Sequence, residues 1–182
     1  LAIVEDAAHA LGATYNDGSK VGNCQYSDMT ILSFHPVKGI AAGEGGMVIT
    51  NDKSLYHKLT LLRSHGITKG NFEFPGISKP DNFLINKNEA LENGELKCWY
   101  YEMQYLGYNY RITDIQCALA TSQMNKIDLF LDARKSMAKY YDQAFSGVQN
   151  IAPLQMHGRD NSSHHIYVVS IDFDKIGISR HQ

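Results

Sequence analysis

The chain has 182 residues, of which 43% are hydrophobic and 20% charged, and its formal net charge is −2; this is the composition of an ordinary globular protein with enough apolar side chains for a core. It contains no basic run of the kind that binds a phosphate backbone, so nucleic acid is not expected as a partner. No apolar stretch reaches the ~20 residues of a membrane-spanning helix and no leader pattern is present, so we expect a cytoplasmic protein that does not bind membranes.

The first predicted element is a buried strand over residues 1–4, a continuous apolar run that Glu5 and Asp6 follow at once. Such runs are typical of central strands in parallel sheets. Open α/β sheets bind their ligands beyond the carboxyl ends of the strands, so Asp6 is predicted at a ligand-binding edge. A carboxylate at this point can equally cap a helix or stabilise a turn, and the sequence alone leaves both interpretations open.

A lysine, Lys38, lies in a loop between two further apolar runs, residues 29–32 and 47–50, which have the length and β-branched content of buried strands. Most lysines are solvated surface residues. An amine that has lost its hydration in a polar pocket, however, is a good nucleophile for a carbonyl group, including that of pyridoxal phosphate. The position of Lys38 between two strands therefore makes it a candidate catalytic residue.

A helix is predicted after the third strand, with Asn51 or Asp52 as its N-cap and Gly66 as its stop signal. Residues 67–106 contain prolines, glycines and asparagines and have no sustained hydrophobic period. A segment of ~40 residues is long for a loop inside a compact domain, which indicates a functional flap or an interface arm.

The last third of the chain begins with an apolar stripe at helical spacing that ends at Gly147 and predicts one long or two broken helices. Residues 151–154 are interpreted as a linker, and residues 165–173 alternate as in a strand that opens a second domain.

The sequence offers no pattern of metal ligands. Its three cysteines, Cys24, Cys98 and Cys117, lie far apart and form no Cys-x-x-Cys pair. His164 and His165 are adjacent, so in a strand they would point to opposite faces. No metal site is expected.

Four blocks then occur in a characteristic order. They are Asp6-Ala7-Ala8-His9-Ala10-Leu11-Gly12, Ser33-Phe34-His35-Pro36-Val37-Lys38, Glu44-Gly45-Gly46 and Gly107-Tyr108-Asn109-Tyr110-Arg111-Ile112-Thr113-Asp114-Ile115-Gln116. Together they resemble the signature blocks of the DegT/DnrJ/EryC1/StrS family of pyridoxal-phosphate sugar aminotransferases, which have the aspartate aminotransferase fold. The Phe-His-Pro-Val-Lys sequence and Trp99-Tyr100-Tyr101-Glu102 most resemble the branch that makes the 4-amino sugar precursor of pseudaminic acid.

The resemblance implies an α/β fold, namely the large domain of a fold-type-I transferase with α/β/α layers and a mostly parallel sheet. Family members are about twice as long as this chain, so we expect a fragment. Residues 1–150 would form the C-terminal part of the large domain, and residues 151–182 the linker and the start of a truncated small domain.

The resemblance also implies the roles of individual residues around pyridoxal 5'-phosphate. Lys38 would bind the cofactor covalently and then move the reacting proton, and Asp6 would contact the ring nitrogen. His9 would hydrogen-bond the ring oxygen, and Ser33 would contact the phosphate. Asn109 would reach the phosphate bound by the partner subunit, which implies a homodimer with shared active sites.

The function implied is transfer of an amino group from an amino acid, expected to be L-glutamate, to a keto group of a nucleotide-linked deoxysugar in cell-surface or flagellar glycan biosynthesis. One alternative is a pyridoxal-phosphate sugar dehydratase, in which a histidine replaces the lysine; Lys38 argues against it. Another is a non-catalytic cofactor-binding regulator or scaffold. A plain nucleotide-binding α/β domain is disfavoured because Val48 occupies the third glycine position of the Gly-x-Gly-x-x-Gly pattern.

Overall fold

The computed structural model describes residues 1–68, 91–93, 95–155 and 158–181. Their contacts form two compact units, one made of Leu1–Ile49 with Asp114–Gln182 and the other of Thr50–Thr113. The predicted division into residues 1–150 and 151–182 stays a prediction. None of the described helices is long and apolar enough to cross a membrane.

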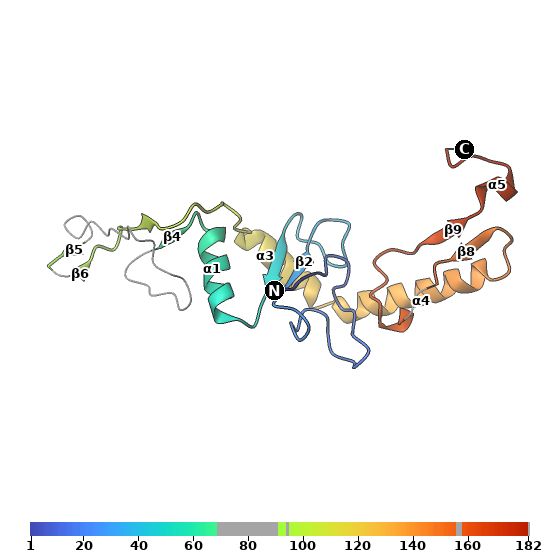
Figure 1. Ribbon diagram of the computed structural model, residues 1–182, viewed down its shortest axis with the longest axis horizontal. Helices are drawn as coiled ribbons and strands as arrows, with labels where there is room; N and C mark the ends of the chain where they lie inside the picture. Colours follow the sequence, from blue (N-terminus) through green and yellow to red (C-terminus); the bar gives the residue numbers. More distant parts are fainter. Residues whose placement is uncertain (69–90, 94, 156–157, 182) are drawn as a thin grey trace. The chain divides into compact units, whose positions relative to one another are not determined.

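The first unit is built on a sheet of three strands in the order β1 (Val4–Asp6), β2 (Met29–Ser33) and β3 (Gly46–Ile49) (Figure 1). β1 and β2 are parallel, whereas β2 and β3 are antiparallel. The bounds predicted for the first strand were wrong, because β1 begins only at Val4 and includes Glu5 and Asp6. Its partner β2 begins at Met29, which pairs with Val4, so pairing and not hydrophobicity sets where the strand begins.

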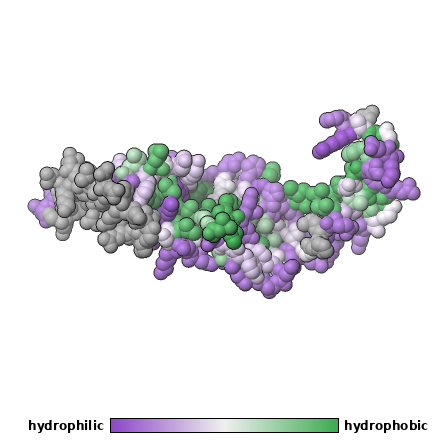
Figure 2. Space-filling model, viewed as in Figure 1, coloured by the Kyte–Doolittle hydropathy of each residue, from purple (hydrophilic) through white to green (hydrophobic). Residues whose placement is uncertain are grey.

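The two faces of this sheet differ in burial. Leu32 is buried on one face, whereas Val4, Ile31 and Val48 lie on the other and are 52%, 38% and 45% exposed. Figure 2 shows apolar surface gathered over these N-terminal strands. β1 and β2 thus have more apolar surface than the described part of the chain buries.

The C-terminal part of the first unit consists of two long helices and a hairpin. α3 (Asp114–Met124) and α4 (Ile127–Phe145) confirm the broken-helix alternative. The linker predicted at residues 151–154 was wrong, because β8 (Ile151–Pro153) pairs antiparallel with β9 (Val169–Ile171). The hairpin follows α4 (Figure 1) and contacts it through β8.

Two short elements complete this part of the chain. The 3-10 helix η1 (Arg159–Asn161) lies between the two strands of the hairpin, and α5 (Phe173–Ile176) follows β9. The strand predicted over residues 165–173 is shorter than expected, because only the residues of β9 have a pairing partner in β8.

A glycine fixes how α4 packs against the loop that follows β1. Gly12 has a φ of +85°, and a Cβ added there would lie 2.5 Å from Cδ1 of Leu131 in α4. Leu131 is itself only 8% exposed. A side chain at position 12 would therefore strain the backbone and displace the Leu131 side chain.

In its described residues, the second unit has α1 (Lys53–Arg63) and four strands of two residues each. Asp52 is the N-cap, as predicted, and accepts a hydrogen bond from the backbone N–H of Leu55 at 2.9 Å. The short strands are β4 (Ile67–Thr68), β5 (Leu91–Glu92), β6 (Glu95–Leu96) and β7 (Glu102–Met103), paired as β4–β7 and β5–β6. Much of the flap or arm predicted at 67–106 lies outside the described residues.

Candidate active site

The site lies at the edge where the two parallel strands end. β1 ends at Asp6 and β2 at Ser33, and the carboxyl ends of parallel strands share one edge of a sheet. Asp6 Oδ1 accepts a hydrogen bond from the Ala8 N–H at 3.1 Å, and Ser33 Oγ accepts one from the His35 N–H at 3.4 Å. Both side chains are therefore held by the turn that follows their own strand.

The loop that carries Lys38 is fixed by its buried side chains and by its backbone. Phe34, Ile40 and Ala42 are at most 3% exposed. The backbone N–H of Phe34 donates to the Gly45 carbonyl at 2.9 Å, and the N–H of Ala42 donates to the Phe34 carbonyl at 2.9 Å. This closes the base of the loop and leaves Lys38 half-buried between two anchored segments.

The structure brings Lys38 and His9 into direct contact, with Lys38 Nζ 2.6 Å from His9 Nε2. Such a contact requires one nitrogen to donate a proton and the other to accept it, so the two groups are not both charged in this arrangement. A proton can pass between an amine and an imidazole in this geometry. Two of the predicted site residues thus form a pair suited to proton transfer.

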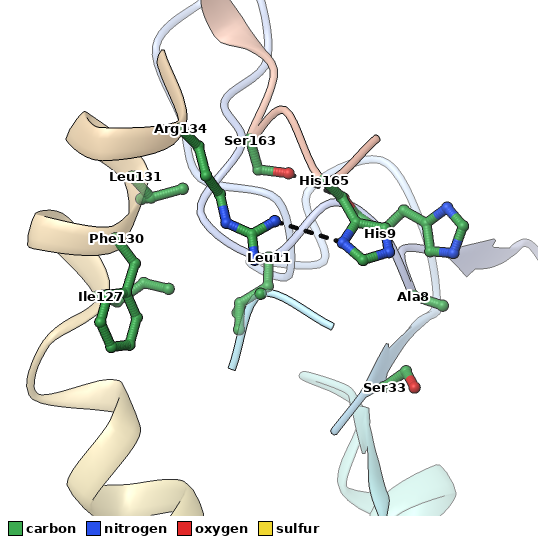
Figure 3. Close-up of a pocket in the computed structure, with 11 residues that line it drawn as sticks. Ala8, His9, Leu11, Ser33, Ile127, Phe130, Leu131, Arg134, Ser163 and His165 are labelled. Atoms are coloured by element: carbon green, nitrogen blue, oxygen red, sulfur yellow. Dashed lines mark hydrogen bonds between the residues drawn. The ribbon is translucent and has the colours of Figure 1, made fainter. Parts of the chain in front are cut away.

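A pocket beside this pair is lined by the predicted residues His9 and Ser33 and by residues from α4 and from the segment after η1 (Figure 3). Arg134 of α4 points toward His165, and its Nη1 lies 3.5 Å from Nδ1 of that histidine. The ring centroids of His165 and His9 are 4.4 Å apart.

Arg134, Ser163 and His165 were not predicted as site residues. The adjacent histidines gave no usable signal for His165, because His164 has a φ of +48° and β9 begins only at Val169, so alternation along a strand does not apply to them. No sequence signal pointed to Arg134, which lies on a helix far along the chain from Lys38.

The electrostatic environment of the pocket is basic. Burial lowers the pKa of His165, and the neighbouring basic groups of His9, Lys38 and Arg134 lower it further. Burial, followed by the charge of Arg159, likewise lowers the pKa of His164. Both imidazoles are therefore neutral at pH 7.

Asn109 belongs to the second unit, where its backbone forms an isolated antiparallel bridge with Ser64. The rings of Tyr108 and Tyr110 on either side of it stack with centroids 4.8 Å apart and planes inclined by 8°. The block is thus ordered within its own unit. The role predicted for Asn109 at a cofactor phosphate stays a prediction.

The donor set at the strand edge fits pyridoxal phosphate. Lys38 provides an amine, Asp6 a carboxylate and His9 an imidazole. The Ser33 oxygen already accepts the His35 N–H, so its own proton is available to an acceptor such as a phosphate oxygen. Amine, acid, ring-oxygen donor and phosphate donor are the kinds of group that this cofactor requires.

These features define the class of protein: the chain belongs to the DegT/DnrJ/EryC1/StrS aminotransferase family, whose family model matches residues 1–182. A UDP-4-amino-4,6-dideoxy-N-acetyl-beta-L-altrosamine transaminase of Campylobacter jejuni is 36% identical over 167 residues, which are 92% of this chain and 37% of that protein. The chain thus spans about two fifths of the length of the curated relatives it matches.

Solved structures give the same result. The structure of Helicobacter pylori PseC, an aminotransferase involved in the biosynthesis of pseudoaminic acid, is similar with a TM-score of 0.73 and 29% identity, covering 97% of this chain and 40% of PseC. The Escherichia coli GDP-4-keto-6-deoxy-D-mannose-3-dehydratase with bound hydrated pyridoxal phosphate is similar with a TM-score of 0.73 and 25% identity, covering 100% of this chain and 42% of that one. The predicted fold class, a fragment of a fold-type-I transferase, is confirmed.

Proposed function

We propose that the whole protein is a pyridoxal-phosphate aminotransferase that moves an amino group from L-glutamate to the keto group of a nucleotide-linked deoxysugar, in the pathway to pseudaminic acid or a related surface glycan. The observation that carries this proposal is the 2.6 Å contact between Lys38 and His9 at the edge where β1 and β2 end. When bound, the cofactor supplies a carbonyl group for amines and an electron-withdrawing ring.

The residues of this chain divide the remaining work. Lys38 would hold the cofactor and move the reacting proton, and His9 is in position to share that proton. Asp6 would place a negative charge beside the ring nitrogen. Ser33, oriented by the His35 N–H, would donate to the phosphate.

A dehydratase is the second candidate, because a dehydratase is among the similar structures. The sugar dehydratases of this family are expected to carry a histidine in place of the lysine, and this chain has Lys38. We therefore favour the aminotransferase, for which the name of the Campylobacter jejuni relative gives independent support.

The assembly and location of the protein are part of the same proposal. We infer a homodimer in which Asn109 of one chain reaches the cofactor phosphate of the other. We also infer a cytoplasmic location, where nucleotide sugars are available as substrates.

The decisive experiment is covalent labelling. The protein is incubated with pyridoxal phosphate, reduced with borohydride and digested, and the labelled peptide is identified by mass spectrometry. We expect the label on Lys38, and we expect an absorbance band that changes when glutamate is added.

Two variants make this experiment specific. Lys38→Ala should lose the label completely, because only an amine can form the reducible bond. Lys139→Ala, which removes an exposed lysine of α4, should keep it. A label of unchanged stoichiometry in Lys38→Ala would contradict the assignment, and a labelled protein that does not respond to any amino acid would indicate a scaffold.

A further inference from the structure

Four basic side chains form a continuous row in the first unit, which we call the basic row: Lys38, His9, His165 and Arg134. Lys38 Nζ lies 2.6 Å from His9 Nε2, the rings of His9 and His165 are 4.4 Å apart, and Arg134 Nη1 lies 3.5 Å from His165 Nδ1. The proposed function uses the first two residues and leaves the other two without a role.

Arg134 contacts no carboxylate within 4 Å in the part of the chain that the structure describes; its hydrogen-bond contact there is to His165. Arg159 shows the contrast, because its guanidinium lies 2.5 Å from the Asp142 carboxylate and also over the ring of Tyr167. A half-buried guanidinium without an anion loses hydration and gains little in return. Its position therefore requires an explanation.

Packing, and not ion pairing, positions Arg134 and His165. Leu131, one helical turn before Arg134, packs on Gly12 in the loop that carries His9. Ser163, two residues before His165, donates its hydroxyl proton to the His9 carbonyl at 2.8 Å. Two segments far apart in sequence thus dock on the same loop.

Because of how His165 is protonated, Arg134 and His165 can both donate hydrogen bonds to a ligand. The Arg134 N–H can only donate, so Nδ1 of His165 accepts and the proton of the neutral imidazole lies on Nε2. The lowered pKa of His165 agrees with the neutral form. The remaining guanidinium N–H groups and the imidazole Nε2–H together suit an oxyanion.

We propose that Arg134 and His165 bind an oxyanion of a substrate beside Lys38. This inference rests on the proposed function, because that function defines which substrates are available. A carboxylate of the amino donor and a phosphate of the nucleotide sugar share the required chemistry, and the experiment distinguishes between them.

The experiment uses the protein loaded with pyridoxal phosphate and two unreactive probes, glutarate for the donor carboxylate and UDP for the nucleotide phosphates. Their affinities are measured by isothermal titration calorimetry for the parent, Arg134→Gln and Arg134→Lys. Lys139→Gln, on an exposed position of the same helix, is the matched control for loss of one positive charge. Circular dichroism verifies folding.

We expect Arg134→Gln to weaken one probe by about tenfold or more, as loss of a charge-assisted hydrogen bond implies, while Lys139→Gln changes neither. Weakened glutarate binding identifies the donor carboxylate as the ligand, and weakened UDP binding identifies the nucleotide phosphate. Arg134→Lys keeps the charge but loses the planar fork, so it should weaken the same probe to a smaller extent. If Arg134→Gln does not fold, Arg134→Lys decides the question.

Unchanged affinity for both probes in a folded Arg134 variant overturns the proposal. It is also overturned if the variant loses only its retention of pyridoxal phosphate, because the guanidinium would then bind the cofactor and not a substrate. Borohydride labelling at Lys38 is followed in parallel. Failure of the parent protein to be labelled rejects the proposed function, whereas a labelled variant with unchanged probe binding rejects only the role of Arg134.

Discussion

At the scale of single residues, two neighbouring carboxylates in β1 have different surroundings. Glu5 accepts hydrogen bonds from the hydroxyls of Tyr15 and Thr30, the latter at 2.9 Å, and Thr30 is completely buried. Asp6, the next residue, points to the opposite face because side chains alternate along a strand. Glu5 therefore stabilises the sheet, while Asp6 is left for the site.

The Glu5–Tyr15 contact predicts a specific pH dependence of stability. Burial, followed by the hydrogen bond to Glu5, raises the pKa of Tyr15 to about 12. An unfolded tyrosine ionises near pH ~10, so between about pH 10 and about pH 12 the unfolded state holds fewer protons than the folded state. The free energy of unfolding should therefore fall as the pH rises through this range.

Urea unfolding at about pH 9 and about pH 11 measures this fall. Tyr15→Phe should show a smaller fall than the parent, because it lacks the shifted group. Tyr140→Phe, which removes a tyrosine that is 66% exposed, should behave like the parent. Parallel curves for Tyr15→Phe and the parent would show that Glu5 does not hold the Tyr15 proton.

Asp6→Asn should keep the cofactor but slow transamination by about two orders of magnitude or more. The amide oxygen of asparagine can still accept the Ala8 N–H, so the turn after β1 is preserved. In the proposed site, the substitution removes the negative charge that Asp6 would place beside the ring nitrogen. Absorbance of the bound cofactor and single-turnover rates with glutamate separate the two effects; near-parental rates would make Asp6 a turn residue only.

At the scale of elements, the end of α1 depends on a close approach between backbones. Gly66 has a φ of +65°, and its N–H donates to the Leu61 carbonyl at 2.9 Å. A Cβ at this position would lie 1.9 Å from the Tyr105 carbonyl oxygen. The helix can therefore end as observed only with glycine at this position.

Gly66→Ala should lower the free energy of unfolding by more than about 2 kcal/mol, because it combines a left-handed backbone with a backbone clash. Gly18→Ala is the matched control: Gly18 has a φ of +82° but open space around the added Cβ, so its cost should be only about 1 kcal/mol. Urea unfolding compares the two variants. Equal costs would mean that the approach of Tyr105 to Gly66 does not matter.

At the scale of the whole molecule, the proposed dimer with shared sites can be tested by complementation. Lys38→Ala and Asn109→Ala should each be impaired as homodimers. A mixture of the two should form heterodimers in which one site combines an unaltered Lys38 with an unaltered Asn109, and activity should return in part. Steady-state rates after subunit exchange measure this recovery.

Mixed dimers must be demonstrated directly, for example by native mass spectrometry. Suppose that subunit exchange is complete and that Asn109→Ala is impaired. If mixing then restores no activity, Asn109 acts within its own chain. A mixture of Lys38→Ala with the parent serves as the control for exchange itself.

The sequence by itself indicated the family, through the four blocks that resemble its signature. It also indicated the first three strands and placed Asp6, Ser33 and Lys38 near strand ends, because hydrophobic runs and turn residues act locally. It also narrowed the N-cap of α1 to Asn51 or Asp52, and the bond of Asp52 to Leu55 spans a single helical turn. These features depend on neighbours in the chain, which a sequence displays.

Only the tertiary structure showed that β8 pairs with β9, that β1 begins at Val4 and that Arg134 and His165 lie beside Lys38 and His9. Each of these facts depends on contacts between residues far apart in the sequence. The packing of Leu131 on Gly12 and the bond from Ser163 to the His9 carbonyl bring α4 and the segment after η1 to the site. No local pattern encodes such an encounter, because it follows from the shapes of two surfaces that meet only when the chain has folded.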